Sequence, residues 1–411
     1  MIVLLIVICL FFCLFDLLAE GKPTLQKQLY HIAFFTIAIL CTARYAYGGD
    51  IAHYIPYYKQ LTGSYRYNVE NYYAWFEPGF DYYCTICKRV GLTFWEMTAV
   101  ISVLYWGAIY WLFSHIKSHH VFALLALVSL DHTVFLEQIR QCLAIALVIY
   151  AFCLYHRFSW KIIPIALLLM SSTIHKTALP MIAFLAMCWF VSGLKTDKKA
   201  YIMLALLLLS CAVIALHPIL KQFVPLLPSS LQNSVSYHLM VGKRVQKILI
   251  LYLMAIVCMA YYTDSRGSKV QGVQGEFSNP KEEKRERLYH WMIWCCMAVI
   301  VVLYQYYLIL YRIRSYMLPF ILVWLLNTLA TTKVKDVLPK QMLAAIMLLF
   351  AVILTIDLPR RHAAMKGHVY NTSWVWERVH HSEKEIHNRQ LEQARLFWEY
   401  DNQKGLQMGY K

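Results

Sequence analysis

The chain has 411 residues, 60% of them hydrophobic, with a formal net charge of +16 and a mean hydropathy of +0.48. This composition excludes an ordinary soluble globular protein, because apolar runs long enough to cross a bilayer core of about 30 Å recur along most of the sequence. The positive charge suits basic cytoplasmic loops that face anionic lipid. No nucleic-acid motif accompanies it, so nucleic acid is not an expected partner.

The apolar runs predict an all-α, polytopic transmembrane protein with about 12 spans. The expected spans are residues 2–19, 29–47, 94–114, 121–136, 139–155, 161–174, 177–194, 201–217, 246–262, 289–310, 315–331 and 341–357. The first span has no basic n-region and no cleavage site, so we expect it to be retained. The sixth and seventh are joined only by Ser171–Lys176, which predicts a broken helical hairpin whose irregular backbone faces protein or water.

The Lys and Arg residues of the short loops predict the orientation of these spans. They fall in alternate loops, which are cytoplasmic if the N-terminus is outside. Residues 1–357 then form one membrane domain, with a cytoplasmic linker at 263–288 and a polar C-terminal tail at 358–411 whose side the charges leave open. We expect the outward-facing loops to form the site. These loops contain Arg44–Arg89, Glu137–Gln141, His175–Lys176, residues 218–245, Arg312 and Arg314.

The segment after the second span is rich in tyrosine. Eleven of the 30 tyrosines lie between Tyr45 and Tyr83, together with Trp75. One interpretation is an aromatic belt at the membrane–water interface, although a belt needs only a few rings at each span end. The other is a sugar-binding surface that includes Trp75, because flat aromatic faces with hydroxyl groups suit sugar rings. Both interpretations stay open.

Arg140 stands in the first turn of the span that begins EQIRQCLAIALV. An arginine at the bilayer boundary is costly unless it reaches water or finds a partner. One interpretation is an ion pair with Glu137, three residues earlier on the same helix. The other is a cradle for phosphate oxygens, because Arg44, Arg312 and Arg314 are expected on the same side and guanidinium groups bind phosphate in a bidentate manner.

His175 and Lys176 lie in the connection STIHKTALP between the two short spans. His175 is either a packing group or a catalytic group, and Lys176 beside it is a further candidate for binding phosphate. The sequence contains no DxD-type carboxylate pair, Walker loop, GxGxxG strand or serine elbow. Their absence argues against a metal-dependent nucleotide-sugar transferase and against an ATP-driven pump. We expect no metal site and no cofactor, and we interpret HIKSHH at residues 115–120 as a solvated loop.

Four motifs occur in order along the chain: RYAYGGDIAHY, EPGF, EQIRQCLAIALVIYAFCLYHRF and SSTIHKTALP. Together they resemble the EpsG family of polytopic membrane proteins, closely over residues 30–195 and more loosely at RIRSYMLPF, which gives an EpsG-like core of residues 30–330. The polar tail after Pro359 is extra to that core. The matching positions are Arg44, Gly49, Asp50, Tyr54, Glu77, Pro78, Arg140, Gln141, His175 and Lys176.

The resemblance implies a Wzy-type polymerase of exopolysaccharide, capsule or O-antigen. Such an enzyme uses undecaprenyl-diphosphate-linked oligosaccharides at the outer face of the bacterial cytoplasmic (inner) membrane. A flippase and a chain-length regulator are the partners it would work with. Tyr54 and Gln141 join Trp75 as candidates for binding sugar.

The expected reaction is a metal-independent glycosyl transfer from a lipid diphosphate to a hydroxyl of a lipid-linked repeat unit. Guanidinium and ammonium groups would stabilise the leaving diphosphate, and the candidates are Arg140, Arg44, Arg312, Arg314 and Lys176. A base must accept the hydroxyl proton, and the candidates, in order, are Glu77, His175 and Asp50. Two alternatives stay open: a glycan ligase of the same chemistry, and a non-enzymatic flippase or transporter, which usually carries charges near midspan and has repeated halves.

Overall fold

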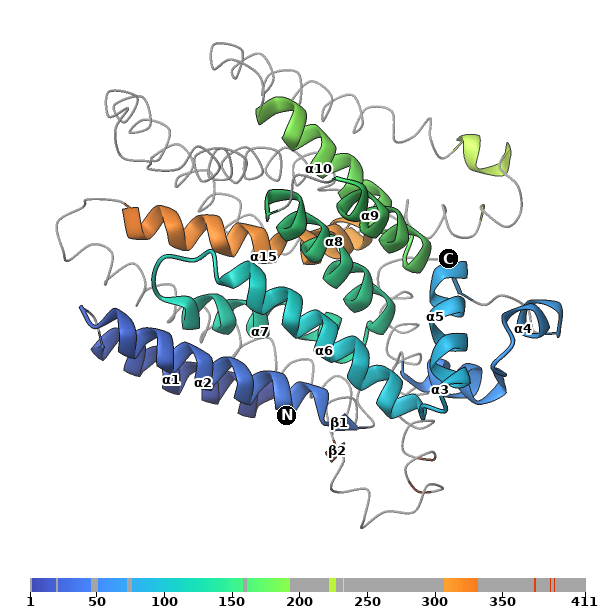
Figure 1. Cartoon of the computed structure of the whole chain (residues 1–411), viewed down its shortest axis with the longest axis horizontal. Coiled ribbons are helices and arrows are strands. Elements are labelled where there is room, and N and C mark those ends of the chain that lie inside the picture. Colours follow the sequence, from blue (N-terminus) through green and yellow to red (C-terminus); the bar gives the residue numbers. More distant parts are fainter. Residues whose placement is uncertain are drawn as a thin grey trace. The chain divides into compact units, whose positions relative to one another are not determined.

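A computed structural model describes residues 2–19, 21–45, 51–71, 76–157, 161–192, 222–226, 232, 307–331, 373–374, 385 and 388. The chain divides into two compact units, of which the first comprises Met1–Ala178 with Leu325–Lys411 and the second Leu179–Trp324. The described elements are almost all helical (Figure 1). The exception is one antiparallel pair of two-residue strands, β1 (Arg44–Tyr45) and β2 (Ser373–Trp374), in which Arg44 lies opposite Trp374.

Helices occur where the apolar runs predict them. They are α1 (Ile2–Leu18), α2 (Pro23–Thr42), α6 (Phe94–Phe113), α7 (His120–Leu136), α8 (Ile139–Arg157), α9 (Ile162–Ile174) and α10 (Ala178–Ser192). The break between α9 and α10, at residues 175–177, confirms the predicted interruption of the helical run there. The spans expected at 201–217, 246–262 and 341–357, and the linker at 263–288, lie outside the described residues, as does nearly all of the tail.

The helix α15 (Tyr307–Thr331) differs from the prediction. The sequence places a loop between the spans 289–310 and 315–331, because Arg312 and Arg314 interrupt the apolar run. In the structure both arginines lie inside α15, which continues through this position. Arginine is a good helix former and removes no backbone hydrogen bond, so these two charges do not end the helix.

Among the described residues, one helix, α6, is both long and apolar enough to cross a bilayer by length and composition. A capping box fixes its first turn: Thr93 Oγ1 accepts a hydrogen bond from the Glu96 backbone N–H, and the Glu96 carboxylate accepts one from the Thr93 N–H. The helix ends before Ser114 and buries residues along most of its length, from Phe94 to Phe113.

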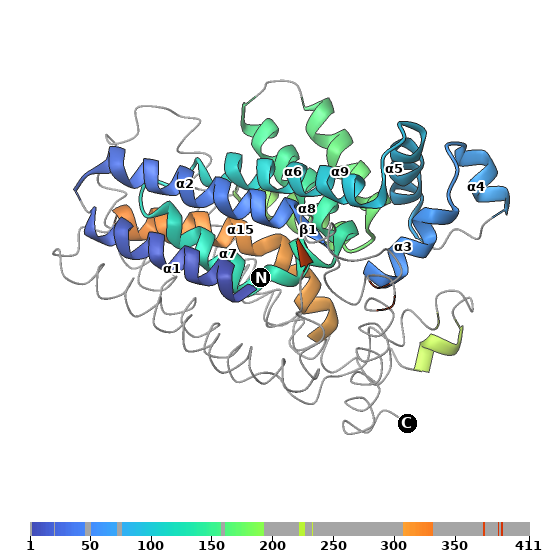
Figure 2. The ribbon, with the colours of Figure 1, turned by 90° about the horizontal axis from the view of Figure 1, so that it is seen from below.

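The core of the first unit forms where these apolar helices meet. Helix α8 contacts both α6 and α9, while α1 and α2 contact each other and α7 (Figure 2). Small residues allow the closest approach, as at Gly107 of α6, which faces Tyr150 of α8. This packing holds the first turn of α8 in place, and that turn carries Arg140.

Three short helices that the sequence did not predict follow α2: α3 (Ile51–Gln60), α4 (Tyr65–Asn71) and α5 (Pro78–Arg89). They gather at one end of α6 (Figures 1 and 2). Pro78 takes the first position of α5, where its missing N–H costs nothing. The residue before it, Glu77, has an extended backbone (φ −68°, ψ 143°), as a residue before proline is expected to have.

Helix α5 packs so closely on α9 that Gly79 is required at their contact. A Cβ atom at Gly79 would lie 2.8 Å from the backbone carbonyl carbon of Thr173. We expect Gly79→Ala to lower the free energy of unfolding by about 1–3 kcal/mol, because one of the two helices must move. Thermal unfolding of the purified wild-type and variant proteins in detergent measures this loss of stability.

Gly107→Ala is the matched control for Gly79→Ala. Its new Cβ would meet the hydroxyl oxygen of Tyr150 at 2.6 Å, and the end of a side chain can rotate away whereas a backbone atom cannot. Gly107→Ala should therefore cost less than Gly79→Ala. Equal unfolding temperatures for the two variants would contradict the close contact of α5 with α9.

Candidate functional site

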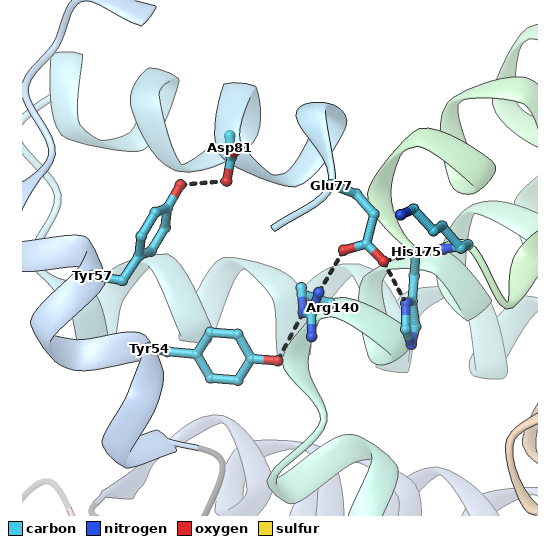
Figure 3. A network of polar contacts seen from close by, with 7 residues as sticks. Tyr54, Tyr57, Glu77, Asp81, Arg140 and His175 are labelled. Carbon is cyan, nitrogen blue, oxygen red and sulfur yellow. Dashed lines mark hydrogen bonds and ion pairs between the residues drawn. The ribbon is translucent and has the colours of Figure 1, made fainter. Parts of the chain in front are cut away.

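Three chain segments that are far apart in sequence bring polar side chains to one place in the first unit (Figure 3). Glu77 precedes α5, Arg140 lies in the first turn of α8, and His175 follows the last residue of α9. Each is therefore at the end of a helix that packs on its neighbours, so the three side chains start from fixed positions.

Glu77 is the carboxylate partner of Arg140. Arg140 Nη1 donates to Glu77 Oε2 over 2.5 Å, and Arg140 Nε donates to the Tyr54 hydroxyl over 2.9 Å. The sequence offered Glu137 as the structural partner, but the ion pair forms with a residue 63 positions earlier in the chain. Bonds from two different nitrogens fix the plane of the guanidinium group.

The other oxygen of Glu77 binds the connection between α9 and α10. Glu77 Oε1 lies 3.2 Å from His175 Nδ1 and accepts a longer bond, 3.4 Å, from the backbone N–H of Lys176. An ionised carboxylate can only accept hydrogen bonds, so the proton of the imidazole resides on Nδ1. In the neutral ring, Nε2 is then the acceptor atom.

Aromatic rings hold Arg140 from the side. The guanidinium carbon lies 4.4 Å from the centre of the Phe76 ring and 5.7 Å from that of Tyr54, both within the range of cation–π attraction. Within the described residues Arg140 Nη2 makes no hydrogen bond, and 24% of the side-chain surface is exposed. The group is thus fixed in orientation and still has donors for a ligand.

Glu77 stays ionised at this site. Burial favours its neutral form, but the hydrogen bond with His175 and the positive charge of Arg140 outweigh burial and lower the pKa of Glu77 to about 2. A carboxylate with so low a pKa is a weak proton acceptor. It is well suited to orient an imidazole and a guanidinium group.

This pKa predicts how Glu77 affects stability. The folded state binds the Glu77 proton more weakly than the unfolded state, so its stabilisation is present above the ordinary pKa of 4.5 and is lost as the pH falls towards 2. The difference in unfolding temperature between wild type and Glu77→Gln should shrink as the pH falls from about 4.5 towards 2, because protonation of the Glu77 carboxylate removes its ion pair with Arg140. A difference of the same size at both ends of that pH range would contradict an ionised Glu77.

A further carboxylate, Asp81, lies one helical turn after Glu77 on α5. The Tyr57 hydroxyl donates to Asp81 Oδ1 over 2.5 Å. Burial raises the pKa of Asp81, and the negative charge of Glu77 adds to this, while the Tyr57 hydrogen bond and Arg140 oppose it. Sequence reasoning missed Asp81, although its spacing of four from Glu77 would have shown it once α5 was recognised as a helix.

Arg44 lies in a different set of contacts. Its Nε donates to the carbonyl of Leu136 (3.1 Å) and its Nη1 to the carbonyl of Cys41 (2.9 Å) and to the Ser102 hydroxyl. The side chain is buried, and among the described residues its Nη2 has no hydrogen-bond partner. These bonds tie the end of α2 to α6 and to the end of α7.

The remaining predicted residues are distributed as follows. Gln141 is buried in the first turn of α8, and Lys176 is exposed beside His175. Asp50 and Trp75 lie outside the described residues, and Arg312 and Arg314 belong to the second unit. Over the described ranges no group of three or more His, Cys, Asp or Glu side chains could hold a metal ion.

A comparison with protein-family models identifies the family of the chain. The model of the EpsG family matches residues 27–368, which include every residue of the network around Arg140. No curated protein and no solved structure matches the chain. The resemblance expected from the four motifs is confirmed: the chain belongs to the EpsG family.

Proposed function

We propose that this protein is a polysaccharide polymerase: a membrane glycosyltransferase that moves an undecaprenyl-diphosphate-linked glycan onto a lipid-linked repeat unit. Membership of the EpsG family indicates an exopolysaccharide-related polymerase in a membrane. The observation that carries the proposal is the guanidinium group of Arg140. Glu77, Tyr54 and Phe76 hold it in one orientation, while its Nη2 makes no hydrogen bond to any residue that the structure describes. A fixed, always-charged donor pair of this kind suits phosphate oxygens.

The proposed location is the outer face of the bacterial cytoplasmic membrane, in a multi-pass protein of about 12 spans. The distribution of Lys and Arg among the short loops supports this orientation. It puts the loop before α5, the start of α8 and the connection after α9 on the outer side, where flipped lipid-linked units arrive. A flippase would deliver those units, and a chain-length regulator would limit the product.

In the proposed reaction, a hydroxyl oxygen of the incoming repeat unit attacks C1 of the donor sugar. The new C–O glycosidic bond forms as the bond from C1 to the diphosphate oxygen breaks, and that oxygen keeps the electron pair. Arg140 and the neighbouring Lys176 stabilise the negative charge that develops on the leaving lipid diphosphate. The transfer requires no metal and no further energy source, because the diphosphate-linked donor is already activated.

The proton of the attacking hydroxyl goes to His175 in this scheme. The contact of its Nδ1 with Glu77 supports this assignment, because it leaves Nε2 as the basic atom and holds the ring in place. The geometry therefore favours His175 ahead of Glu77, whose low pKa suits an orienting role. Asp50 remains a third candidate for the base.

The other candidates keep supporting roles in the proposal. Arg44, Arg312 and Arg314 are further groups for phosphate, although the hydrogen bonds of Arg44 suit a structural role equally well. Tyr54, Trp75 and Gln141 are the candidates for binding sugar. Tyr54 is buried, and its hydroxyl accepts a bond from Arg140, so it also supports the orientation of the guanidinium group.

A deletion strain complemented with the wild-type gene tests the proposal. Gel analysis of surface glycan should show single repeat units and no long chains without the protein, and long chains with it. If the protein were a ligase, the deletion strain would keep finished chains on the lipid carrier. If it were a flippase, the deletion strain would keep repeat units inside the cell. Either of those patterns would overturn the polymerase assignment.

A further inference from the structure

Asp81 and Tyr57 lie next to the guanidinium site but make none of the contacts that the proposed reaction uses. Tyr57 comes from α3 and Asp81 from α5, and both side chains are buried, at 6% exposure each. Their hydrogen bond of 2.5 Å joins α3 to α5, the helix that Glu77 precedes. A buried polar pair beside a candidate site can hold a side chain of that site in place.

We propose that Asp81 is a positioning residue for Arg140, acting through Tyr57 and Phe76. Asp81 accepts the Tyr57 hydroxyl and so fixes the Tyr57 ring. That ring meets Phe76 edge to face, with centroids 4.7 Å apart and planes at 83°. The Phe76 face in turn lies 4.4 Å from the guanidinium carbon of Arg140.

Each contact in this series limits the next. An edge-to-face pair loses its attraction when one ring turns, since it depends on the positive edge of one ring meeting the negative face of the other. If Phe76 turned, Arg140 would lose its cation–π contact and keep only its bonds to Glu77 and Tyr54. Tyr54 packs on the same Phe76 ring, at 5.1 Å between centroids, so the second hydrogen bond of Arg140 depends on this ring as well.

The residue next to Tyr57 packs against a different part of the protein. Tyr58, the next residue of α3, is also buried and also donates through its hydroxyl, over 2.9 Å to the carbonyl of Leu92. Its ring packs on Phe94 at the start of α6 and makes no contact with Phe76 or Arg140 among the contacts of the described residues. Tyr58 is therefore a matched control for a lost tyrosine hydrogen bond.

The inference rests on the proposed function, because it assigns Asp81 a part in orienting the proposed phosphate-binding group. The test compares purified, full-length Tyr57→Phe, Tyr58→Phe, Asp81→Ala and Asp81→Asn proteins in lipid vesicles. One readout is the rate at which phenylglyoxal, an arginine-specific dicarbonyl, modifies Arg140, followed by mass spectrometry. The other is kcat and KM for polymer formation from a synthetic lipid-diphosphate-linked repeat unit.

Tyr57→Phe and Asp81→Ala should speed the modification of Arg140 several-fold and lower kcat about fivefold, the factor that one typical hydrogen bond provides. Tyr58→Phe should change neither value. Asp81→Asn should restore most of both values, because its amide oxygen still accepts the Tyr57 hydroxyl.

The inference is overturned if Tyr57→Phe matches Tyr58→Phe, or if Asp81→Asn is as impaired as Asp81→Ala. A wild-type protein that forms no polymer would refute the proposed function instead, and the modification rates would still decide the role of Asp81.

Discussion

Arg140→Lys should abolish long glycan chains while the protein stays at its normal level in the membrane. Lysine keeps the positive charge but has one nitrogen in place of three. It cannot bond Tyr54 and Glu77 while also offering a planar donor pair to a diphosphate. We expect a loss of about 100-fold or more in polymerisation rate, the size seen when one preorganised donor to a developing charge is removed.

The control for Arg140→Lys is Arg66→Lys. Arg66 pairs with Glu70 on the exposed surface of α4, where its side chain is 89% exposed, and lysine should serve there equally well. Gel analysis of surface glycan, with immunoblotting for protein level, separates the two variants. Wild-type chain lengths in the Arg140→Lys strain would show that the role of Arg140 is purely structural.

His175→Ala should leave single repeat units on the outer surface and no long chains. The variant loses the proposed proton acceptor but keeps the ion pair of Glu77 with Arg140. Loss of a positioned base typically costs about 100- to 10,000-fold in rate. Glu77→Gln should slow the proton-transfer step less than His175→Ala does, because the amide oxygen of glutamine can still accept the bond from His175 Nδ1.

His31→Ala controls for the loss of an imidazole elsewhere in the first unit. His31 of α2 also makes a polar contact, at 3.3 Å from the Tyr110 hydroxyl, but it does not belong to the network around Arg140. The His31→Ala variant should support normal chain lengths. If His175→Ala also polymerises normally, the proposed proton transfer is wrong, and repeat units trapped inside the cell would point to transport.

Apolar run length was enough to predict most of the described helices, because a hydrophobic stretch of span length has few other stable conformations in a membrane. The short helices α3, α4 and α5 were missed for the converse reason. They are polar and tyrosine-rich, and contacts such as the Asp81–Tyr57 bond and the hydrogen bond of Asn68 to Thr85 hold them in place. Such contacts link residues far apart in sequence and leave no periodic pattern.

The candidate site was predictable residue by residue but not as a set of contacts. Arg140, Glu77 and His175 were each identified from the motifs, yet spacing along one helix suggested Glu137 as the partner of Arg140. The observed partner is Glu77, because α8, α5 and the end of α9 meet at that point. No role was assigned to Phe76 from the sequence, because its place against the Arg140 guanidinium depends on the fold of α3 and α5.

The most direct test of the account is polymer formation by the purified protein in vesicles. The assay supplies a synthetic undecaprenyl-diphosphate-linked repeat unit and no other protein, and it measures both glycan length and released lipid diphosphate. Wild-type protein should produce chains of many lengths with one lipid diphosphate released for each bond formed, also in the presence of a chelator, and Arg140→Lys should produce neither. Repeat units that cross the vesicle membrane without growing in length would contradict the account.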